Sequence, residues 1–175
     1  MTPATKTNLE IDVTVSDPDW TTSFLDVEKL AGSGMKLTLR MAVLPKKILG
    51  RDIEASIVLA NDDLIQILNR EYRKKDAPTN VLTFASLDSN DPIPPNAPYP
   101  LGDVILSFQT IDREAREQGK FFKDHFLHMV VHGTLHLLGY DHETEDEANI
   151  MESLEIRILE KMNVQNPYME KLPMA

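Results

Sequence analysis

The sequence contains no cysteine among its 175 residues. Disulfide bonds are therefore excluded, and any metal site must do without thiolate ligands. The chain also lacks an apolar run near the ~20 residues that span a bilayer. Its first residues, MTPATKTNLEIDVTVSD, have neither the apolar core nor the basic leader of a secretory signal. We therefore expect a cytoplasmic protein that makes no contact with a membrane.

Positive charge is scarce, with 18 Lys and Arg against 28 Asp and Glu and a net charge of −10. The overall basic surface of a tight, nonspecific nucleic-acid binder is absent. A local positive channel is still possible, because the basic residues gather in two places. Solvated helix faces are the alternative explanation for both. The two clusters are Arg70, Arg73, Lys74 and Lys75, and Lys36, Arg40, Lys46, Lys47 and Arg51.

The hydrophobic pattern predicts one α+β domain over residues 1–175, in which helices cover a small sheet. A proline-rich segment, DSNDPIPPNAPYP at 88–100, is expected to be a surface loop within this domain. The expected strands are residues 9–15, 54–60, 81–84 and 104–107. The expected helices are residues 20–44 with a possible break at 32–34, 61 or 62 to 73, 109–117, 123–138 and 143–162.

Three of the five histidines fall within one eleven-residue stretch, HGTLHLLGYDH. His132 and His136 are four residues apart, so a helix places both imidazoles on one face. Gly139 suits the left-handed residue that ends a helix, and the turn after it can return His142 to the pair. Three neutral imidazoles leave one tetrahedral position open, as in a catalytic zinc site. We predict one zinc ion per chain on these histidines; hydrogen-bonded histidines without metal are the alternative.

The same spacing, HxxxHxxGxxH, is the ligand frame of the metzincin proteases, in which Glu follows the first histidine and acts as general base. Here that residue is Gly133, which has no group to accept a proton. The spacing therefore predicts a zincin-like metal-binding helix without the peptidase base.

Four other residues near these motifs have two possible roles each. His125 and His128 share the helical face of the metal histidines, where a surface or hydrogen-bonded histidine is the common case. For His128, contact with a metal ligand or with the substrate is a further alternative. Asp141 can orient an imidazole or cap the next helix. Asp103, after a glycine, is either catalytic or part of a turn at a strand start.

The stretch HMVVHGTLHLLGYDH resembles the signature of the YbeY endoribonucleases, bacterial metal-dependent enzymes of ribosomal RNA maturation. LNREYRKKDAPTNVLTF, at 68–84, is similar to a second block of that family, and LGDVILS, at 101–107, to a third. The order and separation of the blocks agree over residues 54–162. Asn80 stands where many members have Asp, and Thr83 and Ala85 stand where Ser and Pro are common.

This resemblance implies a small mixed sheet covered by helices and an enzyme that cleaves single-stranded RNA. It implies maturation of the 16S ribosomal RNA 3′ end and ribosome quality control. The partners implied are ribosomal RNA and the ribosome or its proteins, with no DNA substrate. The resemblance also places the family's functionally important arginine at Arg73. A guanidinium can hold two oxygens of a reacting phosphorus. An ion pair with Glu71 or Asp76 is the alternative for this residue.

Two other functions stay open. One is a metal-dependent hydrolase of another class, such as a peptidase; Gly133 argues against a peptidase because it cannot act as the general base. The other is a ribosome-assembly factor in which the metal is structural. Imidazole ligands also suit nickel and copper, so zinc is favoured on availability and geometry.

Overall fold

The computed structural model describes residues 7–169 and has a four-stranded sheet at its centre. The strands are β1 (Leu9–Val15), β2 (Ile53–Ala60), β3 (Val81–Ala85) and β4 (Tyr99–Ser107), in the order β1-β2-β4-β3. β1, β2 and β4 are parallel, and β3 pairs antiparallel to β4 at one edge. The predicted mixed α+β architecture is confirmed; the ends of the predicted domain, residues 1–6 and 170–175, lie outside the described residues.

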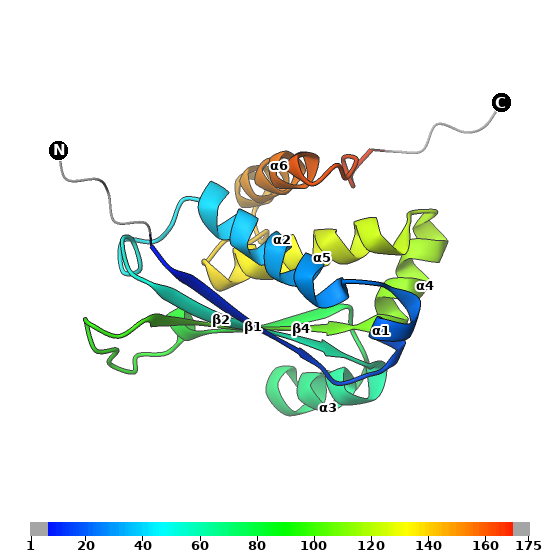
Figure 1. The fold of residues 1–175 in the computed structure, drawn as a ribbon, viewed down its shortest axis with the longest axis horizontal. Helices are drawn as coiled ribbons and strands as arrows, with labels where there is room; N and C mark the ends of the chain where they lie inside the picture. The colour runs from blue at the N-terminus through cyan, green and yellow to red at the C-terminus, as the bar shows by residue number, and fades with distance from the viewer. Residues whose placement is uncertain (1–6, 170–175) are drawn as a thin grey trace.

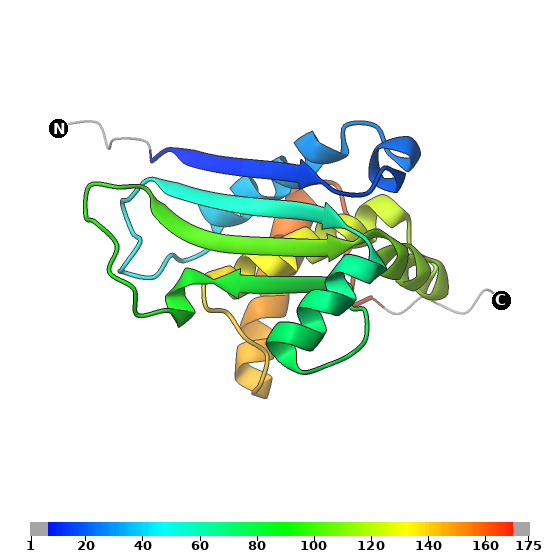
Figure 2. The same cartoon turned by 90° about the horizontal axis from the view of Figure 1, so that it is seen from below.

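The helices form two unequal layers around this sheet (Figure 1). α2 (Val27–Met41), α4 (Phe108–Gln118), α5 (Phe122–Leu137) and α6 (Glu145–Lys161) lie over one face, with the short α1 (Asp19–Ser23) near its end. α3 (Asp62–Arg73) covers the other face, beside β3, and a 3-10 turn, η1 (Ser86–Asp88), follows β3 (Figure 2). Within residues 7–169, no helix has the length and apolar character needed to cross a bilayer.

Two glycines allow α5 to lie close to its neighbours. A Cβ added at Gly133 would come within 2.8 Å of Val104 Cγ1, so this side of α5 is pressed against the sheet. A Cβ added at Gly34 of α2 would lie 3.2 Å from Val130 Cγ1 of α5. α5 is therefore held between the sheet and α2, and most of its side chains are buried.

The predicted helix over residues 20–44 is two helices, and the predicted break at 32–34 is wrong. The chain leaves the helix at Phe24 and re-enters it after Asp26, which adopts the left-handed conformation at φ 60°. Gly32 and Gly34 lie inside α2. Gly34 is there for close packing against α5 rather than for a turn, and tertiary contact offsets its low helix propensity.

β4 begins at Tyr99, five residues before its predicted start, so the proline-rich loop is shorter than expected. Tyr99 is fully buried and pairs with Ile53 of β2. A register shift follows, and Gly102 has φ +139°; a Cβ there would lie 2.1 Å from the Phe84 carbonyl oxygen. Asp103 therefore lies within a strand beside a bulge, and the predicted turn at a strand start is wrong.

α3 has the predicted start. The Asn61 side chain accepts a hydrogen bond from the backbone N–H of Leu64 at 2.9 Å, which satisfies one unpaired donor of the first turn. Ile65 is buried against the sheet, as the pattern predicted. Tyr72 was expected on the same inner side but is 63% exposed, with its ring edge-on to Phe84.

We predict that Gly133→Ala lowers the free energy of unfolding by about 1–3 kcal/mol, because the new methyl group meets Val104 with no space to occupy. Denaturant unfolding measures the change. Gly32→Ala is the matched control: it is also a helical glycine, but its added Cβ meets nothing within 4 Å. It should be neutral or mildly stabilising. Equal effects in the two variants would contradict the close packing.

Candidate metal centre

Three imidazoles converge where α5 ends. The Nε2 atoms of His132 and His136 lie 3.1 Å apart. The His142 ring centroid lies 5.6 Å from that of His132 and 5.3 Å from that of His136. One ligand atom from each residue lies within 4.8 Å of the others. The predicted return of His142 to the pair is confirmed.

The turn between α5 and α6 is held at both ends. Gly139 has φ 93°, its N–H donates to the His136 carbonyl, and the Tyr140 N–H donates to the Leu135 carbonyl. This double closure is the Schellman motif that a left-handed glycine permits. At the other end, the Thr144 hydroxyl caps α6 by accepting the Glu147 N–H at 3.2 Å.

Thr144, and not Asp141, caps α6, so the capping alternative for Asp141 is wrong. Its Oδ1 accepts the backbone N–H of His142 at 2.8 Å, which helps to set the chain direction at this residue. Its carboxylate also acts electrostatically on His136.

The donor set suits a divalent metal ion. Burial lowers the pKa of His136, and the neighbouring His132 and His142 lower it further, which keeps its lone pair available near neutral pH. Two nitrogens bound to one tetrahedral zinc at about 2.1 Å each would lie about 3.4 Å apart, close to the separation found here. His142 is exposed, so the cluster is open to solvent on that side. The cluster could hold one metal ion with a position left for a reactant.

A buried carboxylate lies behind these imidazoles. Glu155 of α6 is 1% exposed, and its Oε1 lies 3.5 Å from His132 Nδ1. Its Oε2 is hydrogen-bonded to His128 Nε2, and the Tyr168 hydroxyl donates to Oε1 at 3.0 Å. Burial acts to raise the pKa of Glu155, but the interactions of the carboxylate with His128 and His132 outweigh burial and lower the pKa to about 2. The carboxylate is therefore ionised in the folded protein.

Glu155 and Tyr168 were not recognised from the sequence. A signal for Glu155 exists, since it lies on the same face of α6 as the buried Met151, Leu154 and Ile158. An acidic residue inside an apolar helical stripe indicates a buried partner. Tyr168 carries no such pattern.

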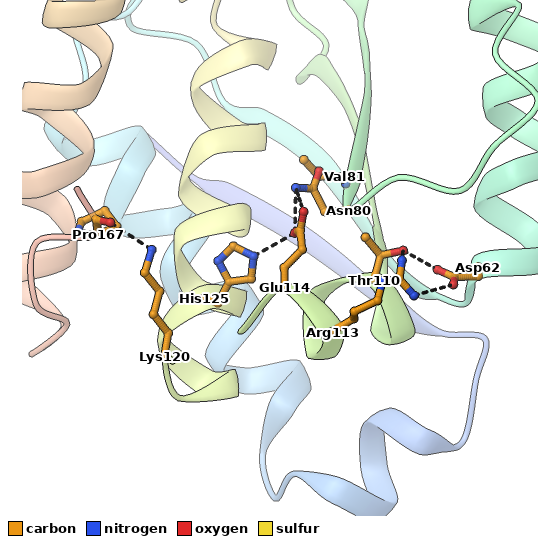
Figure 3. A network of polar contacts seen from close by, with 9 residues as sticks. All are labelled: Asp62, Asn80, Val81, Thr110, Arg113, Glu114, Lys120, His125 and Pro167. Atoms are coloured by element: carbon orange, nitrogen blue, oxygen red, sulfur yellow. Dashed lines mark hydrogen bonds and ion pairs between the residues drawn. The ribbon is translucent and has the colours of Figure 1, made fainter. Parts of the chain in front are cut away.

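His125 and His128 are buried and hydrogen-bonded, so the hydrogen-bonded alternative is confirmed for both and the surface alternative is wrong. His125 Nε2 is 2.9 Å from Glu114 Oε1 (Figure 3). Burial lowers the pKa of His125, while Glu114 acts in the opposite sense. Asn80 Nδ2 donates to both oxygens of Glu114, at 3.0 and 3.3 Å. An aspartate at position 80 would instead place a second negative charge beside Glu114. The asparagine found here, where many family members have Asp, therefore suits the Glu114 carboxylate as a hydrogen-bond donor.

Arg73 lies at the free edge of β3, on the side covered by α3. Its Nη2 donates to the Thr83 carbonyl at 2.7 Å, and its guanidinium carbon is 5.2 Å from the centroid of the Phe84 ring. Glu71 and Asp76 pair with Arg70 instead, so the ion-pair alternative for Arg73 is wrong. Among residues 7–169, no hydrogen bond or ion pair joins Arg73 to the three histidines.

Arg73 borders a small hollow of about 320 Å³ that also includes Phe84, Ser86, Gly102 and Asp103. α5 packs on the opposite side of β3, since Gly133 faces the side chains of Val81 and Thr83. β3 therefore stands between Arg73 and the histidine-bearing helix. A substrate that contacts both must cross this edge of the sheet.

This chain is similar to known proteins in both sequence and fold. The family model described as Endoribonuclease YbeY matches residues 12–163. The Endoribonuclease YbeY of Paramagnetospirillum magneticum is 49% identical over 164 residues, 93% of this chain and 98% of that protein. That of Dinoroseobacter shibae is 41% identical over 168 residues, 90% of each. The solution structure of TM1509 from Thermotoga maritima has a similar fold, with a TM-score of 0.53 and 23% identity over 95% of this chain and 99% of that one. The chain therefore belongs to the endoribonuclease YbeY family.

Proposed function

We propose that this protein is a zinc-dependent endoribonuclease that cleaves single-stranded RNA. The observation that carries the proposal is the convergence of His132, His136 and His142 in a member of this family. We further propose that its substrate is ribosomal RNA, that it acts in maturation of the 16S 3′ end and in ribosome quality control, and that it works in the cytoplasm with the ribosome or its proteins.

In this proposal the three histidines hold one zinc ion per chain. A bound zinc supplies an activated water, because it lowers the pKa of that water to about 7. The lowered pKa of His136 favours the neutral imidazole that a ligand requires. The exposure of His142 provides the approach for a phosphodiester from solvent. The zincin-like character of α5 rests on the histidine spacing and stays a prediction.

Arg73 is proposed to stabilise the charge that builds up on phosphorus. The Thr83 carbonyl and the Phe84 ring hold the guanidinium at the β3 edge, while its remaining N–H donors can contact phosphate oxygens. A single strand crossing this edge would place one segment at Arg73 and another at the histidines. Such a path suits an unpaired strand better than a rigid duplex.

The position of Gly133 argues against the peptidase alternative. The spacing of the metzincins requires a carboxylate at this residue to reach the metal-bound water. Here a Cβ added at residue 133 would meet Val104 and Val81 of the sheet. A glutamate side chain at this position would clash with the hydrophobic core instead of reaching a substrate.

The first prediction from this proposal concerns metal content. Replacing His132, His136 or His142 by Ala should remove zinc and RNA cleavage together, because each removes one of three ligands. Metal analysis of purified, folded protein measures the loss. His125→Gln is the control, since His125 pairs with Glu114 and not with the three ligands, and should keep one zinc per chain. Full metal content in all three Ala variants would rule out the assignment.

A second prediction concerns peptides. The unaltered protein should not hydrolyse casein at a useful rate, because no general base occupies position 133. Robust casein cleavage that a chelator abolishes would favour the peptidase over the nuclease.

The third prediction separates catalysis from affinity at Arg73. Arg73→Ala should lower the single-turnover rate at saturating RNA by on the order of 10²–10³, as for loss of one charge-stabilising donor. Arg73→Lys should rescue little, because an ammonium lacks the planar fork. Zinc content and unfolding midpoint should stay unchanged in both.

Lys75→Ala is the matched control for Arg73, because it removes one exposed positive charge from the same cluster. It should weaken RNA affinity and its salt dependence while leaving the saturating rate intact. An unchanged saturating rate in Arg73→Ala would assign Arg73 to RNA binding alone.

A further inference from the structure

The contacts of Glu155 point toward the proposed metal site. His132 turns Nε2 toward His136, at 3.1 Å from that residue's Nε2, and turns its other nitrogen, Nδ1, toward Glu155. Nδ1 of His132 is buried, and Glu155 Oε1 at 3.5 Å is the only charged oxygen recorded beside it within residues 7–169. A neutral imidazole carries one proton, so a carboxylate at Nδ1 selects the form whose lone pair is on Nε2.

We propose that Glu155 is a positioning residue for the metal centre. Its carboxylate draws the proton of His132 to Nδ1, orients the ring, and leaves the Nε2 lone pair directed at the ion. A carboxylate behind a ligating histidine also raises the basicity of the ligand. This inference rests on the proposed metal ligands and adds a residue that the ligand spacing does not contain.

Glu155 is itself held in place from two other directions. His128 Nε2 contacts Oε2, and the Tyr168 hydroxyl donates to Oε1. Tyr168 also lies 3.2 Å from His128 Nε2, so the three side chains close a small network. A carboxylate with contacts on both oxygens has little freedom to rotate. The network joins α5, α6 and the segment after α6, and it fixes the distance between Glu155 and His132.

A second metal site built from His128, His132 and Glu155 is the competing interpretation, since their ligand atoms also lie within 4.8 Å of one another. The contacts speak against it. Glu155 Oε2 and His128 Nε2 are in direct hydrogen-bond contact, which leaves no space for an ion between them. Oε1 accepts from the Tyr168 hydroxyl and also faces His132 Nδ1. Both carboxylate oxygens therefore already contact hydrogen-bond donors and are not free to bind a cation.

The test measures metal affinity rather than activity. Glu155→Gln keeps the size of the side chain and removes its charge. It should weaken zinc binding about 10–100-fold, the usual effect of losing such a partner. Competition between the folded apo-protein and a chromogenic chelator gives the affinity. The visible absorption spectrum of the cobalt-substituted protein should also shift, because the geometry at His132 changes.

The chain offers a matched control in the pair formed by His125, earlier on α5, and Glu114 of α4 (Figure 3). Glu114→Gln removes the same charge from the same kind of histidine pair, and its amide oxygen can still accept from Asn80. Glu114 makes no recorded contact with the three proposed ligands in the described part of the chain. Its zinc affinity and cobalt spectrum should equal those of the unaltered protein.

Three results would overturn the proposal. Glu155→Gln could lower the unfolding midpoint but leave zinc affinity and the cobalt spectrum unchanged, which would make Glu155 purely structural. Glu155→Gln and Glu114→Gln could weaken zinc binding equally, which would indicate a general charge effect. The unaltered protein could hold two zinc ions and Glu155→Gln one, which would make Glu155 a ligand.

Two further variants keep the test decisive. If Glu155→Gln does not fold, Tyr168→Phe replaces it: loss of one hydrogen bond to the carboxylate should weaken zinc binding several-fold, and unchanged affinity would overturn the proposal. His132→Ala separates this inference from the proposed function. Zinc retained in His132→Ala defeats the ligand assignment itself, whereas zinc lost there but held normally by Glu155→Gln defeats the role of Glu155 alone.

Discussion

The close approach of α5 to the sheet is the constraint on which the rest of the site depends. Gly133 has no side chain, so Val104 and Val81 of the sheet reach the helix backbone. On the other side, Gly34 lets α2 approach Val130. These contacts fix the rotation of α5 about its axis, because interiors pack densely and tolerate little displacement. That rotation decides which nitrogen atoms face one another at the end of the helix.

Burial of this helix creates a second requirement. His125 and His128 lie within the protein, where a polar ring without a partner costs free energy. Each has a carboxylate, Glu114 of α4 and Glu155 of α6. The two pairs look alike but differ in position. Glu155 also contacts His132, so a residue that satisfies a buried histidine also lies beside the proposed metal centre.

The edge strand β3 organises the other half of the site. α3 lies on one side of it and the histidine-bearing α5 on the other (Figure 2). Arg73 is the last residue of α3 and donates to the Thr83 carbonyl of β3. A proposed catalytic arginine and a proposed metal therefore belong to different layers of the fold. In the proposed function the substrate would contact both, which is easier for a flexible single strand than for a folded protein or a duplex.

Local features of the sequence were sufficient to predict the histidine cluster and several helices and strands. The spacing of His132 and His136 with Gly139 after them predicted the cluster, because helix period and a left-handed turn are local properties. Likewise, Asn61 predicted the start of α3, and alternation predicted β1.

Tertiary structure decided the rest. Gly34 allows close contact with the Val130 side chain, and Gly102 allows close contact with the Phe84 backbone. Arg73 meets Thr83 across a turn, and Glu155 meets His132 from another helix. Such contacts join residues far apart in the chain, and no local pattern of charge or hydrophobicity specifies them.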